Sequence, residues 1–104
     1  MNRVFTGTEI KVNVSIEPID GFSMQDYDFE VEFFCSPVYR QVVKKEQAKK
    51  VDKDNYLCLV DTKVVGAGDL KCKVIAYLPD ADFEDDTRTE VEVIETGITI
   101  VNAQ

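Results

Sequence analysis

The sequence predicts an all-β domain: an antiparallel β-sandwich of the immunoglobulin-like kind, with about seven strands. Apolar and polar residues alternate along several short runs, which is the pattern of strands with one buried face. Turn-forming residues separate these runs at intervals of about ten residues, as in sandwiches and barrels. No stretch requires a helix of ordinary length. A small β-barrel is the alternative architecture.

Length and composition narrow the class of protein. A chain of 104 residues predicts one domain, 1–104, with a single core. The net charge of −8 argues against a nucleic-acid partner, because such binding depends on Lys and Arg neutralising phosphates. No apolar run approaches the roughly 20 residues of a membrane-spanning helix, so neither a membrane segment nor a secretory signal is expected.

The N-terminal part of the chain predicts two strands. Residues 1–8 form either an edge strand or an arm that contacts a partner. Residues 9–16 alternate cleanly, with their isoleucines and valines facing inward. A turn is expected at 18–21, after which Phe22 and Met24 cap one end of the core.

Residues 27–34 predict the next strand, with aromatic residues and Val31 inward and a row of carboxylates outward: Asp28, Glu30 and Glu32. Acids at this spacing are typical of a solvated strand face. Such a row also protects a strand that lies at the edge of a sheet. A further strand is expected at 38–43, after a bend at Pro37.

Half of the twelve basic residues lie between Arg40 and Lys53. Residues 44–50 are expected to form a β-connection, or a strand that continues to Val51, before a turn at 52–55. This basic segment predicts contact with an acidic partner surface, including a second copy of the acidic chain; a solvated hairpin tip is the alternative. With the N-terminal arm, the candidate partner-binding residues are Phe5, Arg40, Lys44, Lys45, Lys49 and Lys50.

Residues 56–60 are apolar on both faces, which predicts a central strand covered on both sides. Gly66-Ala67-Gly68 then predicts a reversal of the chain. Residues 70–78 alternate until Pro79 ends the strand, and one face carries Leu70, Cys72, Val74 and Ala76.

The acidic loop Asp80–Asp86 is the one stretch that suggests metal chemistry. Asp80, Asp82 and Glu84 stand at positions 1, 3 and 5 of a calcium-binding loop of the helix–loop–helix type. Position 6 is Asp85 rather than glycine, and no helical pattern flanks the loop. We therefore expect a solvated loop with Phe83 pointing inward, and no metal or other cofactor.

Two final strands are expected at 89–94 and 98–101, with Gly97 between them. In the first of these, Val91 and Val93 alternate with Glu90 and Glu92.

The three cysteines, at positions 35, 58 and 72, predict neither a disulfide framework nor a zinc site, because their number is odd and no C-x-x-C occurs. Cys58 and Cys72 lie in apolar strands, where a free thiol packs as a small hydrophobic group. A single bridge between these two is the alternative. Reduced thiols are consistent with assembly in cytosol.

An enzyme is not expected. The sequence contains no histidine, which is the most common general base and metal ligand. Acidic pairs such as Glu30 and Glu32 lie on regular strands. The domain is therefore expected to act by binding. A carbohydrate- or cell-surface-binding module is one alternative; its outward aromatic candidates are Tyr39, Tyr56 and Tyr77.

A series of short motifs between Tyr56 and Val101 resembles small virion proteins of tailed bacteriophages, especially crAss-like and related gut phages, and the N-terminal β-sandwich of phage baseplate upper proteins. The motifs are Asp61-Thr62, Gly66-Ala67-Gly68-Asp69-Leu70, Pro79-Asp80-Ala81-Asp82-Phe83, Arg88-Thr89-Glu90-Val91 and Thr96-Gly97-Ile98. The related loops continue with Asp-Gly, whereas this chain has Asp85-Asp86.

The resemblance implies a non-enzymatic structural role in a virion assembled in the host cytoplasm. The protein would decorate the capsid as an auxiliary protein or dock a head fibre, and a baseplate or tail adaptor is the alternative. The implied partners are the major capsid protein, fibre proteins or baseplate proteins, or further copies of the chain. The family has no active site to transfer.

Overall fold

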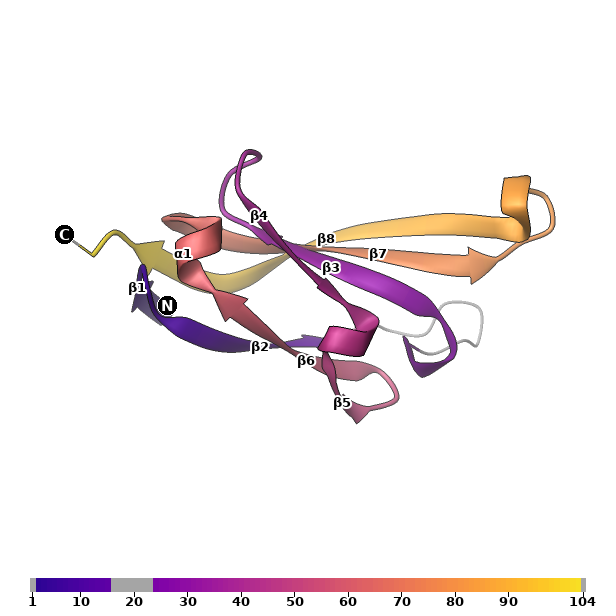
Figure 1. The fold of residues 1–104 in the computed structure, drawn as a ribbon, viewed down its shortest axis with the longest axis horizontal. Helices are drawn as coiled ribbons and strands as arrows, with labels where there is room; N and C mark the ends of the chain where they lie inside the picture. Colours follow the sequence, from indigo (N-terminus) through magenta and orange to yellow (C-terminus); the bar gives the residue numbers. More distant parts are fainter. Residues whose placement is uncertain (1, 16–23, 104) are drawn as a thin grey trace.

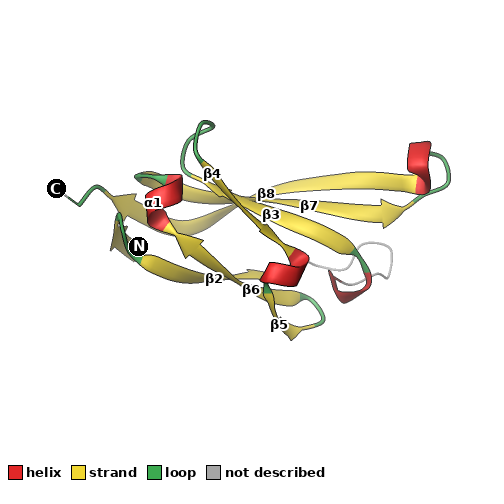
Figure 2. Cartoon of the chain, viewed as in Figure 1, coloured by secondary structure: helices red, strands yellow, loops and turns green. Residues whose placement is uncertain are grey.

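The computed structural model describes residues 2–15 and 24–103, which form two packed β-sheets (Figures 1 and 2). The five-stranded sheet has the order β1-β8-β7-β3-β4, and the three-stranded sheet has the order β2-β6-β5. The strands are β1 (Asn2–Phe5), β2 (Glu9–Ser15), β3 (Asp28–Phe34), β4 (Arg40–Lys44), β5 (Lys49–Asp52), β6 (Asn55–Asp61), β7 (Gly68–Pro79) and β8 (Thr87–Val101). The short helical turns are η1 (Met24–Asp26), η2 (Lys45–Gln47), α1 (Thr62–Val65) and η3 (Glu84–Asp86).

This topology confirms the predicted all-β sandwich. Neighbouring strands are antiparallel except for β1, which runs parallel to the end of β8. The order β2-β6-β5 opposite β8-β7-β3-β4 is that of an immunoglobulin-like sandwich. The sequence allowed two interpretations of residues 1–8, an arm or an edge strand. In the structure β1 is an edge strand, and its Val4 packs against the core.

The core forms where the alternation predicted inward residues. Val12 and Val14 of β2, Phe29 and Phe33 of β3, and Leu70 of β7 are all less than 9% exposed. The rings of Phe29 and Tyr56 meet edge to face across the two sheets, with centroids 4.9 Å apart. Met24 is buried as predicted, whereas Ile16 and Phe22 lie outside the described residues.

β3 lies inside its sheet, between β7 and β4. Two expectations about strand positions are wrong. β6 is central in its sheet but is covered on one face only, since Leu59 is 62% exposed. The two final strands are one strand, β8, because Gly97 takes a φ of 78° that glycine tolerates without leaving the sheet.

The basic segment connects the five-stranded sheet to the three-stranded sheet. Rather than continuing β4, residues 45–47 form the turn η2, and β5 then joins the three-stranded sheet. The ammonium of Lys45 fixes this turn by donating to the backbone carbonyls of Met24, Gln25 and Tyr27.

A side chain closes part of the gap between the sheets. Gln41 of β4 donates to the carbonyl of Leu59 at 3.2 Å and accepts the N–H of Asp61 at 2.8 Å. The amide of Gln41 therefore forms hydrogen bonds with the edge of β6 where the short β5 no longer pairs with it.

Helix α1 was not predicted, and it precedes the expected Gly66–Gly68 reversal. Asp61 caps it by accepting the N–H of Lys63 at 3.0 Å. Gly68 has a φ of 133°, and a Cβ there would lie 3.1 Å from the Cβ of Cys35, so both its conformation and its space favour glycine.

Candidate protein-binding surface

The outer face of the five-stranded sheet points away from the three-stranded sheet and carries charged, aromatic and apolar side chains. The strand registers arrange these side chains in rows across β4, β3, β7 and β8. The rows are Arg40–Phe34–Lys71–Glu95, Val42–Glu32–Lys73–Val93 and Lys44–Glu30–Ile75–Val91, followed by Asp28–Tyr77–Thr89.

Apolar side chains are exposed within these rows. Val42, Val91 and Val93 are 44%, 53% and 56% exposed. The alternation along β8 therefore places the valines toward solvent, and Glu90 and Glu92 on the opposite face. Val91 and Val93 stand two residues apart on the same face of β8, so together they form an apolar patch that a protein partner would cover.

Charged neighbours are paired within the outer face. The guanidinium of Arg40 bonds Glu32 at 3.2 Å and stacks over the ring of Phe34, 4.5 Å from its centroid. The carboxylates of β3 lie on the solvent-facing side of the sheet, as expected, and lysines and Arg40 of neighbouring strands stand beside them.

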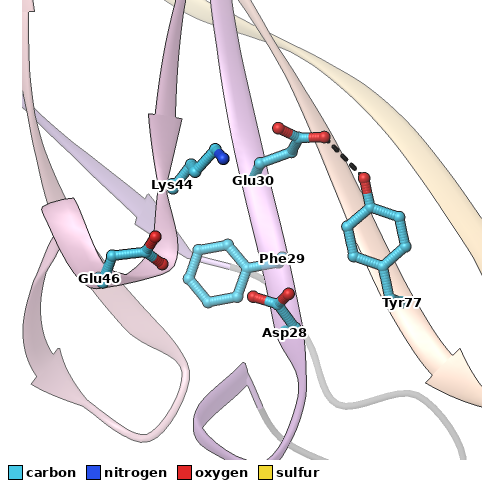
Figure 3. A pocket seen from close by; sticks show the side chains of 6 residues that line it. All are labelled: Asp28, Phe29, Glu30, Lys44, Glu46 and Tyr77. Atoms are coloured by element: carbon cyan, nitrogen blue, oxygen red, sulfur yellow. Dashed lines mark hydrogen bonds between the residues drawn. The ribbon is translucent and has the colours of Figure 1, made fainter.

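A pocket of about 230 Å³ opens at one end of the outer face, between β3, η2 and β7 (Figure 3). Its lining residues are Asp28, Phe29, Glu30, Lys44, Glu46 and Tyr77. Three carboxylates and one ammonium line the pocket, so its lining carries a net negative charge.

Tyr77 is fixed by its neighbour in this pocket. Its hydroxyl donates to Glu30 Oε1 at 2.6 Å, the contact drawn in Figure 3. This hydrogen bond, together with desolvation and the nearby carboxylates, raises the pKa of Tyr77 to about 12. The phenol therefore remains protonated at physiological pH.

The predicted metal-ligand candidates are held by other contacts. Asp80 accepts the N–H of Asp82 at 3.0 Å and pairs with the guanidinium of Arg88 at 3.2 Å. Within residues 2–15 and 24–103, no three acidic, Cys or His side chains converge in a ligand set. Phe83 was expected to point inward, but it is 52% exposed, so that expectation is wrong.

The structure does not gather the six predicted partner-binding residues into one site. Arg40 and Lys44 lie on the outer face, Lys49 lies exposed on β5, and Lys50 donates to Gln25 at 2.6 Å. Lys45 is occupied by the three carbonyls described above. Phe5 is 62% exposed on β1, away from the basic segment.

The remaining predicted residues are placed as follows. Cys58 and Cys72 are buried free thiols, and burial raises the pKa of each to about 11, so the alternative bridge between them is absent from this structure. Of the three tyrosines proposed for sugar contact, Tyr39 is exposed, Tyr77 is half-buried and Tyr56 is buried in the core. None of the described helices has the length and hydropathy needed to cross a bilayer.

Sequence reasoning missed the exposed valines of the outer face and the bridging Gln41. The alternation of residues 89–94 indicates two different faces, but it does not show whether either face is buried. The structure shows that β8 extends beyond the part of the five-stranded sheet that the three-stranded sheet covers (Figure 1).

No protein-family model matches this chain, and no curated protein matches it. Among solved structures, the fold resembles part of a candidate glycoside hydrolase from Bacteroides vulgatus, with 10% identity and a TM-score of 0.49. The match covers all of this chain, which spans 17% of that protein. A likeness at this level assigns no function to the chain.

Proposed function

We propose that this chain is a non-enzymatic structural domain that acts by binding other proteins in a phage virion. The observation that supports binding is the outer face, where Val42, Val91 and Val93 are exposed among ordered charged residues. Burying such valines against a partner would remove apolar surface from water, and the ordered charges would set the orientation of the partner.

The virion context rests on the resemblance of residues 56–101 to small phage structural proteins. Within that context, an auxiliary protein on the capsid or a docking protein for a head fibre is the first role, and a baseplate or tail adaptor is the second. A weak contact per copy is sufficient in such a particle, because repeated copies supply avidity.

The acidic pocket adds a charged contact to the expected interface. With Asp28, Glu30 and Glu46 around Lys44, it would receive a basic side chain of the partner at one end of the face. The apolar contact with the valines would lie beside it, across the row that includes Ile75 and Val91.

The test begins with particles banded on a density gradient from a culture in which the chain is produced. We expect mass spectrometry to find the chain in the fraction that contains tailed particles. Tagged variants then probe the surface: Val93→Lys should reduce incorporation at least about tenfold, since it places a charge in an apolar contact.

Val38→Lys is the matched control, because Val38 is 73% exposed and lies in the loop before β4, outside the rows of the outer face. It should incorporate normally. Absence of the chain from the particle fraction contradicts the virion role. Equal incorporation of both variants contradicts the assignment of the outer face.

A further inference from the structure

One long strand edge lies open on the side of the sandwich formed by β2 and β8. β8 pairs with β7 from Thr87 to Ile100, with one irregularity between Asp69 and Lys71, but it pairs with β1 only through Ile98–Val101. Among the described residues, no strand pairs with the far edge of 87–96. Such an edge presents backbone N–H and C=O groups that a strand from another molecule can pair with.

The charge of the chain is concentrated next to this edge. Residues 80–96 contain eight acidic residues and one arginine, a net charge of −7, against −8 for the whole chain. Residues 40–53 contain six basic and two acidic residues, a net charge of +4. The chain therefore carries an acidic and a basic segment of opposite sign on one small domain.

The two segments lie on opposite sides of the sandwich. A groove of about 260 Å³ between residues 12–15 of β2 and residues 94–96 of β8 shows that these strands share one side. β4 and β5, joined by η2, form the edges at the other side. The two segments of one molecule therefore do not contact each other, whereas those of successive molecules can meet head to tail.

The registers show that the two edges match. β8 and β4 run in opposite directions, because each of the three steps β8–β7–β3–β4 is antiparallel. When β8 of one molecule lies beside β4 of the next in the same rows, Glu95 meets Arg40 and Val93 meets Val42. Opposite charges and paired valines are both favourable cross-strand neighbours.

We propose that copies of this chain associate head to tail, with the acidic β8 edge of one copy against the basic β4–β5 side of the next. This inference deepens the proposed protein-binding function, on which it rests, by naming a second copy as a partner. The two tests fail separately, because particle fractionation does not depend on association in solution.

The first measurement is the mass of the pure chain by light scattering at several concentrations and salt levels. At about 100 mM salt the Debye length of about 10 Å screens the net charge while contact pairs persist, so the mass should rise with concentration above 11.8 kDa. At about 1 M salt it should return toward the monomer. A monomer under all conditions overturns the proposal, and a different partner would then occupy the edge.

Charge-reversed variants supply the second measurement. Arg40→Glu makes the basic side of this contact acidic, and Glu95→Lys makes its acidic side basic. Each variant alone should associate at least about threefold more weakly than the wild type, because the attraction between Glu95 and Arg40 becomes a repulsion between like charges. Mixing the two variants should restore association.

Lys63→Glu is the control, since Lys63 is exposed on α1 outside both segments. The Lys63→Glu variant should associate as strongly as the wild type, although its net charge is more negative. Thermal denaturation of each variant checks that it is folded. Folded variants that associate unchanged, or that fail to associate on mixing, overturn the proposal.

Discussion

At the residue scale, Thr62 shows how one polar side chain joins two distant parts of the chain. It is fully buried, and its hydroxyl donates to the carbonyl of Thr8 and accepts the N–H of Gly7, each at 2.8 Å. The turn between β1 and β2 is thereby tied to the start of α1. No pattern in the sequence indicated this role, because a threonine beside an aspartate is equally typical of an exposed turn.

Replacing Thr62 with valine keeps the shape but removes both hydrogen bonds. The N–H of Gly7 would lose its partner and the C=O of Thr8 would keep only the backbone N–H of Thr62, so we expect the free energy of unfolding to fall by about 1 kcal/mol. Urea denaturation measures the change. Thr89→Val, at an exposed strand position, should stay within about 0.5 kcal/mol. Equal effects of the two substitutions would contradict the role of Thr62.

The aspartates at the tip of the β7–β8 hairpin adopt a conformation that usually requires glycine. Asp85 and Asp86 have φ values of 60° and 54°, in the left-handed region. We expect Asp86→Gly to raise the free energy of unfolding by about 0.5 kcal/mol, since relief of strain exceeds the added chain entropy. Asp82→Gly, where φ is not positive, should give no gain in the same denaturation assay.

Tyr77 gives a pH-dependent signature of the acidic pocket. Its pKa is raised to about 12, so its stabilising contribution is complete below pH 10 and is lost as pH rises toward 12. In Glu30→Ala the accepting carboxylate, which is the largest cause of the shift, is removed, and the pKa of Tyr77 should fall toward its ordinary value. Spectrophotometric titration of the tyrosines, with Tyr77→Phe to assign the transition, measures this. An unchanged titration curve would show that Glu30 does not hold the phenol.

At the element scale, the strands with one consistently buried face were predicted more accurately than β8, which was expected as two separate strands. β2, β3 and β7 alternate along their whole length, because each contributes one face to the core. β8 extends beyond the end of the three-stranded sheet, so solvent reaches both of its faces there. One face carries the valines and the other carries the glutamates. Local pattern does not encode where the opposing sheet ends. It also does not encode Gln41, whose amide bonds to a strand 18 residues away at its nearest contact.

The open edge of β8 should be visible in hydrogen exchange. Alternate N–H groups of an antiparallel edge strand point toward its partner and away from it. In conditions that keep the chain monomeric, we expect the amides of 87–95 to alternate between protected and unprotected, by at least about tenfold, while β7 is protected throughout 71–77. NMR exchange rates test this. Uniform protection along β8 would mean that its edge is covered.

At the scale of the whole molecule, the hairpin makes the domain long. Its extents are 51 × 28 × 22 Å, and its radius of gyration of 14.7 Å exceeds the roughly 13 Å of a compact domain of this length. The acidic and basic segments could be identified from the sequence, because charge is a property of composition. Their placement on opposite sides depends on strand order, which no single-sequence pattern specifies.

The parallel pairing of β1 with β8 has a mechanical consequence. Asn2 pairs with Ile98 and Phe5 with Val101, so the two chain ends leave this pair in opposite directions (Figure 1). Tension applied between residues 2 and 101 would load the inter-strand hydrogen bonds in shear, and they would have to fail together. Tension applied across the hairpin, between Leu70 and Thr96, would instead separate its strands bond by bond. Single-molecule pulling should therefore record a higher rupture force through the termini than through that second pair of attachment points.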